Sequence, residues 1–311
     1  MLALTSCTGK LGKATLNAIL EYNLIPLKDL VICTSSSTSN SRWDYLKSQG
    51  VQIRSFNFDN PSPSTFKDCT SLYLISTPNI SMDFNNAPPG SGREKAHIGA
   101  IEAAREAGVT SFFYTSLAFG SDSGAGVMRA HLRTEEFLKD LREREGVKVT
   151  VMREGLYNES WPLYLGYFDP KGDERGEVVL AGDGKISWTA IRDLGLASAL
   201  VLADGSGKFE GKTFYLSRRE GPRSMSEIAR LVGEARGKEV SVRVVGRDEY
   251  VETCMKRGIE RASVEWWSST YAALDRGECL IDDPTLDDLL TSRGVKTTAV
   301  EDTVREMLQI P

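Results

Sequence analysis

The turn that follows the first predicted strand carries two glycines at a spacing suited to binding a phosphate. Gly9 permits close approach of the backbone to a pyrophosphate, and Gly12 permits close packing of the next helix on the strand. The N-terminus of that helix would add unpaired N–H groups and the positive end of its dipole. Ser6 stands where the usual pattern has a first glycine, so a purely structural turn remains an alternative. The candidate phosphate-binding residues are Thr5, Cys7, Thr8, Gly9, Lys10, Leu11 and Gly12.

The end of the second predicted strand indicates which dinucleotide would bind. A ribose diol is usually held by an Asp or Glu about 20 residues beyond the glycines. The sequence at this point is instead Thr34, Ser35 and Ser36, with Arg42 shortly afterwards. Hydroxyl groups and a guanidinium suit a 2′-phosphate, which favours NADP(H) over NAD(H). A solvated polar loop would explain the same residues without a ligand.

The elements that must position this turn alternate in the order typical of a parallel sheet covered by helices. We therefore predict an α/β protein with a Rossmann-type doubly wound parallel sheet and a smaller, mostly helical C-terminal part that binds the substrate. Strands are predicted at 2–6, 29–34, 51–58, 71–77, 111–116 and 147–152, and helices directly after the turn, at about 93–108 and at about 129–142.

The chain is predicted to divide into two domains at about residue 155. Residues 1–155 form the dinucleotide-binding domain, and residues 185–216 return to it. Residues 156–184 and 217–311 form a smaller α/β domain that binds the substrate.

Three helix starts in the second half of the chain carry recognisable caps. Ser224 and Glu227 form a capping-box pattern ahead of an apolar run. Asp193 is a candidate N-cap of a helix that continues to about residue 203. Thr298 with Glu301 has the same spacing as a capping box and is predicted to open the last helix.

Composition argues against several classes of protein. The chain has 38 basic and 43 acidic residues, a net charge of −5, and no basic stripe of the kind that binds nucleic acid. No apolar run approaches the roughly 20 residues that span a bilayer, and the first residues do not resemble a secretory signal. The five cysteines are scattered without a CxxC pair, and the aspartates at 282–288 fit helix caps better than metal ligands. We expect a cytoplasmic protein that binds no metal, no nucleic acid and no membrane.

Taken together and in order, five stretches resemble the NmrA-like branch of the atypical short-chain dehydrogenase/reductases, and the resemblance covers nearly the whole chain. This branch includes bacterial quinone and triphenylmethane reductases, the fungal regulator NmrA and many fungal pathway enzymes. The resemblance implies a Rossmann-type fold, NADP(H) as cofactor and a small-molecule substrate. The stretches are 4–12 (LTSCTGKLG), 56–61 (FNFDNP), 103–109 leading into 114–116 (AAREAGV and YTS), 131–135 (HLRTE) and 153–157 (REGLY).

Further cofactor contacts are carried over from this resemblance. Asn57 and Phe58 fall where the family lines the adenine, although Asn57 replaces a more usual Asp. Ser76, Thr77 and Pro78 should line the cofactor between its ribose and its nicotinamide.

The resemblance also locates the substrate. Nicotinamide and substrate are expected to meet at 114–116, and the segment after Tyr157 should cover the substrate. Trp161, Tyr164 and Tyr167 in that segment could line an aromatic-binding pocket, or they could form an ordinary small core.

The residue that supplies a proton is less clear, because conventional short-chain dehydrogenases use a Tyr four residues before a Lys. The matching positions here are Val127 and His131, so the Tyr is absent and His131 corresponds to the histidine that the NmrA-like reductases retain. His131 could supply a proton near neutral pH, or it could only hydrogen-bond the ribose or the backbone. Tyr157 is a second candidate donor or a half-buried aromatic, and Ser116 could orient a substrate carbonyl. His97 fits a structural histidine better.

The leading prediction is an NADP(H)-dependent oxidoreductase that reduces a C=O, C=C or C=N bond of a small aromatic, quinone-like or heterocyclic substrate. The resemblance suggests a role in fungal secondary metabolism, and we expect a monomer or a homodimer. Two alternatives stay open. The missing Tyr and Ser6 are compatible with a non-catalytic, redox-sensing regulator that binds a protein partner. The second alternative is an isomerase or cyclase on the same scaffold. The Ser6 side chain could crowd the pyrophosphate, so that the dinucleotide is not used as a redox cofactor.

Overall fold

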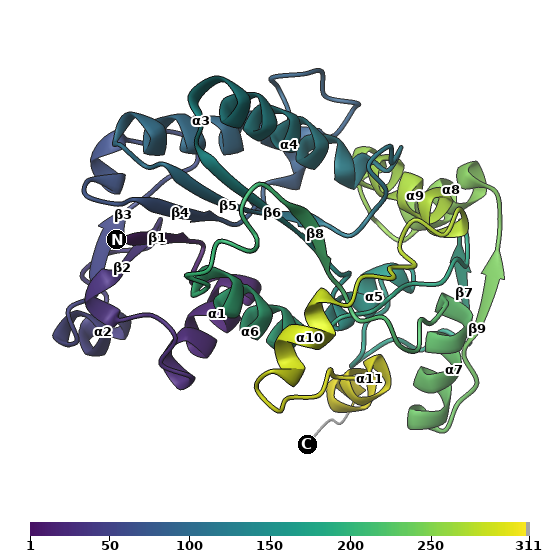
Figure 1. Ribbon diagram of the computed structural model, residues 1–311. Helices are drawn as coiled ribbons and strands as arrows, with labels where there is room; N and C mark the ends of the chain where they lie inside the picture. The colour runs from purple at the N-terminus through teal and green to yellow at the C-terminus, as the bar shows by residue number, and fades with distance from the viewer. Residues whose placement is uncertain (309–311) are drawn as a thin grey trace.

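A computed structural model describes residues 1–308 and shows one large sheet of seven parallel strands (Figure 1). Its strand order is β3-β2-β1-β4-β5-β6-β8, which reverses direction between β1 and β4. Ligands of such sheets bind at the carboxyl ends of the strands where the order reverses. The predicted fold class is confirmed. The strands are β1 (Leu2–Thr5), β2 (Leu30–Thr34), β3 (Gln52–Ser55), β4 (Ser71–Leu74), β5 (Ser111–Leu117), β6 (Lys148–Glu154) and β8 (Thr213–Leu216).

Helices cover both faces of this sheet, and each layer has its own apolar core. Figure 1 shows α3 and α4 above the sheet and α1, α6 and α10 beneath it. The strands alternate their buried side chains between these two layers, as expected for a parallel sheet buried on both faces. The covering helices are α1 (Lys10–Glu21), α3 (Arg93–Glu106), α4 (Gly126–Glu145), α6 (Ile191–Leu202) and α10 (Thr285–Thr291), and the short α2 (Asp44–Ser48) follows β2.

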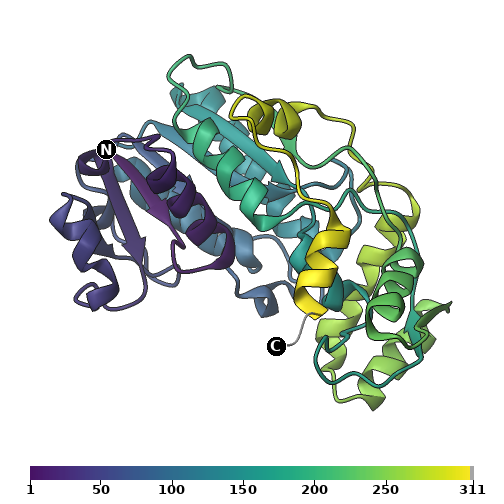
Figure 2. The same ribbon diagram turned by 90° about the horizontal axis from the view of Figure 1, so that it is seen from below.

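A smaller part with its own core lies beyond one end of the sheet (Figure 2). It contains a two-stranded parallel sheet and the helices packed around it. The predicted end of this part, 309–311, lies outside the described residues. Its elements are α5 (Trp161–Tyr164), β7 (Glu177–Leu180), α7 (Met225–Arg236), β9 (Ser241–Val244), α8 (Arg247–Lys256), α9 (Arg261–Asp275) and α11 (Val300–Leu308).

The division between the two parts differs in one place from the predicted division. Residues 185–216 contain β8, which joins the large sheet, and α6, which packs beneath that sheet beside α1. The helix α10, however, buries Leu286, Leu289 and Leu290 in the core shared by α1 and α6. The range 217–311 is therefore not all part of the smaller unit, because the chain crosses back before it ends in α11.

The predicted helix starts are partly right. The capping box of Ser224 and Glu227 is present at the start of α7. The prediction for Asp193 is wrong, because α6 begins two residues earlier and Asp193 lies inside its first turn. Its carboxylate accepts hydrogen bonds from the backbone N–H and the hydroxyl of Thr298, at 2.6 and 3.0 Å. Thr298 therefore ties the chain before α11 to α6 and does not form the predicted capping box with Glu301.

Candidate functional site

The glycine turn lies between β1 and α1, at the carboxyl edge of the sheet. Gly9 is the N-cap residue of α1 and no side chain caps this helix, so its first-turn N–H groups are open to an anion. A Cβ atom on Gly12 would overlap the carbonyl oxygen of Ser6, which explains the need for glycine there. Ser6 has a φ of +57°, a left-handed conformation that strains most residues other than glycine. The turn therefore forms a backbone cradle that fits a pyrophosphate.

Several side chains of the turn point into the core. The Thr5 hydroxyl donates to the Tyr73 carbonyl, at 3.1 Å, and the Cys7 thiol lies 3.7 Å from the Leu4 carbonyl. Burial raises the pKa of the Cys7 thiol to about 12. Leu11 is buried in the core beneath α1. Thr5, Cys7 and Leu11 can thus offer a phosphate only their backbone atoms, whereas Thr8 and Lys10 are exposed.

An open pocket of about 760 Å³ lies beside the turn, between α1 and the loop after β2. Arg42 lines one part of it, and its Nε donates to the Asn40 side chain at 3.1 Å. Lys13, which the sequence reasoning did not single out, contributes a second cation from α1. The two cations and the Thr8 hydroxyl suit a phosphate monoester.

The remaining candidates from the end of β2 lie close to this pocket but do not line it. The hydroxyl of Thr34 is buried and accepts a hydrogen bond from the Ser36 N–H, at 3.1 Å, which shapes the loop. Ser35 is exposed.

The predicted adenine and nicotinamide segments lie at the ends of β3 and β4. Asn57 is exposed and its side-chain oxygen accepts from the Asp59 N–H at 3.0 Å, while Phe58 packs edge-on against His97. The Thr77 N–H donates to Nε2 of His97, at 3.1 Å. Ser76 also contacts that nitrogen, and Pro78 is exposed.

Two histidines, which are 34 positions apart, meet through a tyrosine beneath these segments. His97 on α3 and His131 on α4 both contact the hydroxyl of Tyr114 on β5, at 3.3 and 2.8 Å from their Nδ1 atoms. Thr134 completes this histidine cluster, with its hydroxyl 3.0 Å from Nδ1 of His97. All four side chains are at most 2 % exposed. His97, interpreted from the sequence as structural, is buried and hydrogen-bonded at both nitrogens.

Burial keeps both imidazoles neutral. It lowers the pKa of His97 to about 3 and the pKa of His131 well below its usual range, and the Arg93 guanidinium adds to both shifts. An imidazolium at His131 is therefore disfavoured near neutral pH, which favours the hydrogen-bonding alternative for this residue. A neutral imidazole can still donate a hydrogen bond from a protonated ring nitrogen.

Ser116 lies next to a buried ion pair. Its hydroxyl donates to Glu135, at 2.5 Å, and Glu135 pairs with Arg153, at 2.6 Å. Arg153 also donates to the hydroxyls of Ser121 and Tyr215. Because the Ser116 proton is engaged by a carboxylate, the structure does not support the expected role of this hydroxyl in orienting a substrate carbonyl.

Tyr157 contacts a second buried carboxyl group. Its hydroxyl donates to Glu154, at 3.1 Å, and its ring packs against the core beneath α1. Burial raises the pKa of Tyr157 well above its usual range and that of Glu154 to about 8. This arrangement matches the half-buried aromatic that was the alternative for Tyr157, and it gives no support to proton donation to a substrate.

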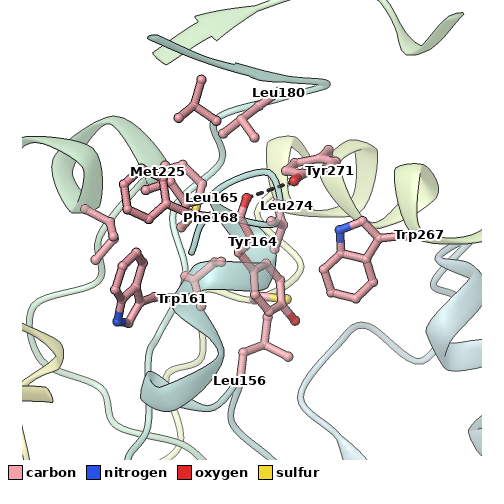
Figure 3. Packing of buried hydrophobic residues seen from close by; sticks show 14 of the residues in the cluster. Leu156, Trp161, Tyr164, Leu165, Phe168, Leu180, Met225, Trp267, Tyr271 and Leu274 are labelled. Atoms are coloured by element: carbon pink, nitrogen blue, oxygen red, sulfur yellow. Dashed lines mark hydrogen bonds between the residues drawn. The ribbon is translucent and has the colours of Figure 1, made fainter. Parts of the chain in front are cut away.

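The aromatic residues after Tyr157 mostly build the core of the smaller part. Trp161 is completely buried and Tyr164 is 5 % exposed, and Figure 3 shows Tyr164 among the residues of that core. The Tyr271 hydroxyl donates to the Tyr164 carbonyl, at 2.8 Å. Trp161 and Tyr164 therefore form the ordinary core that was the alternative to an aromatic-binding pocket, whereas Tyr167 is only partly buried at the edge of this core.

Sequence reasoning missed the ion pair of Asp83 and Arg93, which lies next to the histidine cluster. Both residues are at most 5 % exposed and their side chains are 2.6 Å apart. Arg93 also donates to the Ser76 hydroxyl and to the Val127 carbonyl. The one signal in the sequence was the spacing of Arg93 and His97, which puts them on the same face of a helix.

Neither a metal site nor a membrane-spanning helix is found in the part of the chain that the structure describes. No group of His, Cys, Asp or Glu among these residues could hold a metal ion. No helix within 1–308 is long and apolar enough to cross a membrane.

Comparisons with known proteins identify the family. No protein-family model matches the chain. It is 31% identical to the NmrA-like family domain-containing oxidoreductase flvB of Aspergillus flavus, over 98% of this chain and 94% of the relative. The fold matches quinone oxidoreductase of Escherichia coli complexed with NADPH, with a TM-score of 0.78, 24% identity and coverage of 99% of this chain and 100% of that one. It also matches triphenylmethane reductase of Citrobacter sp. complexed with NADP(H), with a TM-score of 0.73, 24% identity and 99% coverage of both chains. The chain therefore belongs to the NmrA-like family and has the fold of the atypical short-chain dehydrogenase/reductases.

Proposed function

We propose that this protein is an NADPH-dependent reductase of a small, conjugated acceptor such as a quinone or a cationic aromatic dye. The observation that carries the proposal is the open N-terminus of α1 beside a pocket with Lys13 and Arg42. The N-terminus suits the pyrophosphate and the two cations suit the 2′-phosphate. The family membership and the relatives crystallised with NADP(H) support the same cofactor. When bound, NADPH would supply a hydride.

The chemistry of the nearby side chains favours a conjugated acceptor. Hydride addition to an isolated carbonyl produces an alkoxide, which needs an acid close by. Hydride addition to a quinone produces a delocalised phenolate, and addition to a cationic dye produces a neutral product. His131 is neutral, and the protons of Tyr157 and Ser116 are engaged by the carboxyl groups of Glu154 and Glu135. Such a site is better suited to acceptors that need only a neutral hydrogen-bond donor.

This proposal is tested by following NADPH absorbance with a panel of acceptors. The panel contains a benzoquinone, a naphthoquinone, a triphenylmethane dye, a conjugated enone, a cyclic imine and, as the matched unconjugated compound, cyclohexanone. We expect turnover with at least one quinone or dye and none with cyclohexanone. NADPH binding without turnover of any member would contradict the proposal. A role in fungal secondary metabolism stays a prediction until a natural substrate is known.

A redox-sensing regulator is the second candidate, and one observation favours it. Val127 stands at the position of the conventional catalytic Tyr, and its backbone carbonyl is occupied by Arg93. A sensor would bind NADPH and NADP⁺ with different affinities and retain a protein partner in one state only. Equal affinity for both forms, measured by calorimetry on the same preparation, would exclude this role.

A further inference from the structure

The geometry points to Tyr114 as a positioning residue that fixes the proton of His131 on Nε2. A directed chain of hydrogen bonds runs from Arg93 through Ser76, His97 and Tyr114 to Nδ1 of His131. The assignment of this tautomer does not depend on the reaction. Only the use of the Nε2 proton rests on the proposed function.

The proton of His97 can be placed from its partners. The backbone N–H of Thr77 donates to Nε2, at 3.1 Å, so Nε2 accepts and carries no proton. Ser76 receives a hydrogen bond from Arg93, and its own hydroxyl proton has two acceptors, the same Nε2 at 3.1 Å and the more distant Thr77 carbonyl at 3.5 Å. The shorter contact directs this proton to Nε2. In the neutral ring the proton must then be on Nδ1.

The Nδ1 proton of His97 meets two oxygen atoms. The Thr134 hydroxyl donates its proton to the Ala130 carbonyl, at 2.8 Å, so the Thr134 oxygen accepts a hydrogen bond from His97. The Tyr114 oxygen is 3.3 Å from the same nitrogen and is the second, longer acceptor. Both contacts leave the phenolic proton of Tyr114 unused.

The phenolic proton has one good acceptor. Nδ1 of His131 is 2.8 Å from the Tyr114 oxygen, the shortest contact in the histidine cluster. If His131 carried its proton on Nδ1, two protons would compete for this contact, and the phenolic proton would be left with the Thr134 oxygen, which already accepts from His97. His131 therefore accepts at Nδ1 and carries its proton on Nε2, the tautomer opposite to that of His97.

This arrangement gives a neutral imidazole a defined function. The chain of hydrogen bonds begins at the Arg93 guanidinium, which is paired with Asp83. Each hydrogen bond along it therefore points the same way, from Arg93 toward His131. Ser76 and Thr77, which form its first links, belong to the segment expected to line the cofactor. Nε2–H of His131 would then serve as a fixed hydrogen-bond donor to the cofactor ribose or to the acceptor oxygen, without becoming an imidazolium.

Nitrogen NMR of the full-length protein labelled with ¹⁵N-histidine tests the assignment directly, because the chain contains only two histidines. The two-bond proton–nitrogen pattern distinguishes the tautomers, and a His97→Gln variant assigns the signals. We expect one ring with Nδ1–H and one with Nε2–H, both unchanged between about pH 5.5 and 8. Two rings of the same tautomer, or His131 protonated on Nδ1, would overturn the proposal.

Tyr114→Phe then tests the positioning role. It removes the donor to His131 and keeps the ring, so we expect the His131 signals to shift to a mixture of tautomers while His97 retains Nδ1–H. Tyr73→Phe is the matched control, since Tyr73 is an equally buried tyrosine on β4 whose hydroxyl contacts Thr15 in the other core. It should leave both histidines unchanged. An unchanged His131 in a folded Tyr114→Phe variant would contradict the proposal.

The effect of the His131 tautomer on turnover is measured separately, by steady-state kinetics. With an acceptor that the wild type reduces, Tyr114→Phe should lower kcat on the order of tenfold and leave the KM for NADPH within about twofold. A wild type that turns over no acceptor would defeat the proposed function and leave the tautomer assignment standing. Normal kcat together with a disordered His131 tautomer would show that the Nε2 proton has no part in turnover.

Discussion

The glycine turn and the histidine cluster both lie near the carboxyl ends of central strands, but they are built in opposite ways. In the turn the backbone provides the cradle, and Thr5 and Cys7 are directed into the core. In the histidine cluster the side chains make most of the contacts, and the backbone contributes the Thr77 N–H and the Ala130 carbonyl. Substitutions that add atoms should therefore disturb the glycine turn most. Substitutions that remove a hydrogen-bond or ion-pair partner should disturb the histidine cluster most.

The largest effect is expected where a buried charge would lose its partner. Asp83→Ala leaves the Arg93 guanidinium buried without a carboxylate and should lower the free energy of unfolding by about 3–5 kcal/mol. Urea denaturation of the full-length protein measures this change. Asp302→Ala is the control, because it breaks an exposed pair with Arg305 and should cost less than about 1 kcal/mol. Equal effects of the two variants would mean that the charge of Arg93 is not buried as described.

The turn has its own sensitive position. Gly12→Ala forces a Cβ atom into the Ser6 carbonyl oxygen, so we expect a loss of about 2–3 kcal/mol in unfolding free energy and weaker NADPH binding. Thermal unfolding with and without NADPH measures both. Gly205→Ala, where a Cβ would meet no atom within 4 Å, is the matched control and should be nearly neutral. If Gly12→Ala retains the stability and NADPH affinity of the wild type, the described contact between turn and helix is incorrect.

Glu154 makes stability fall as pH rises, which is opposite in sign to the effect of the two buried histidines. The folded protein keeps its carboxyl proton up to about pH 8, mainly because burial disfavours the charge, whereas an unfolded chain loses it near the usual value of 4.5. The free energy of unfolding should therefore fall as pH rises through this window. Glu154→Gln removes that dependence and should stabilise the protein by about 3 kcal/mol more at pH 8 than at pH 5.5. Parallel stability–pH curves for variant and wild type would contradict the raised pKa.

The smallest effect is expected at Ser6. Its positive φ suits glycine, so Ser6→Gly should raise the free energy of unfolding by up to about 1 kcal/mol. If the serine side chain also crowds the pyrophosphate, NADPH affinity will rise as well. Calorimetric titration separates the two effects, and a decrease in both quantities would show that the hydroxyl makes a favourable contact with the cofactor.

The same contrast explains what could be predicted from the sequence. The turn, the strands and the capping box of Ser224 and Glu227 are local patterns, and all three are present. The meeting of His97 and His131 depends on how α3 and α4 pack over β5, which no local pattern specifies. The choice between a pocket and a core for Trp161 and Tyr164 also depends on packing: they begin and end a single helical turn, and both face one core.

The position of α10 shows a related difficulty. Leu286, Leu289 and Leu290 recur at helical spacing, but this spacing does not specify which of two cores the helix covers. Asp is frequent at helix N-caps, which favours Asp193 as a cap, yet the partner of Asp193 is Thr298, more than 100 residues later. Long-range contacts of this kind decide the boundary between the two parts of the molecule.

Calorimetric titration of NADPH and NADH tests the central claim most directly. The account predicts that the wild type binds NADPH at least about tenfold more tightly than NADH, and that a Lys13→Ala and Arg42→Ala double variant loses this preference while keeping its NADH affinity. Equal affinity of the wild type for the two dinucleotides, or no binding of either, would contradict it.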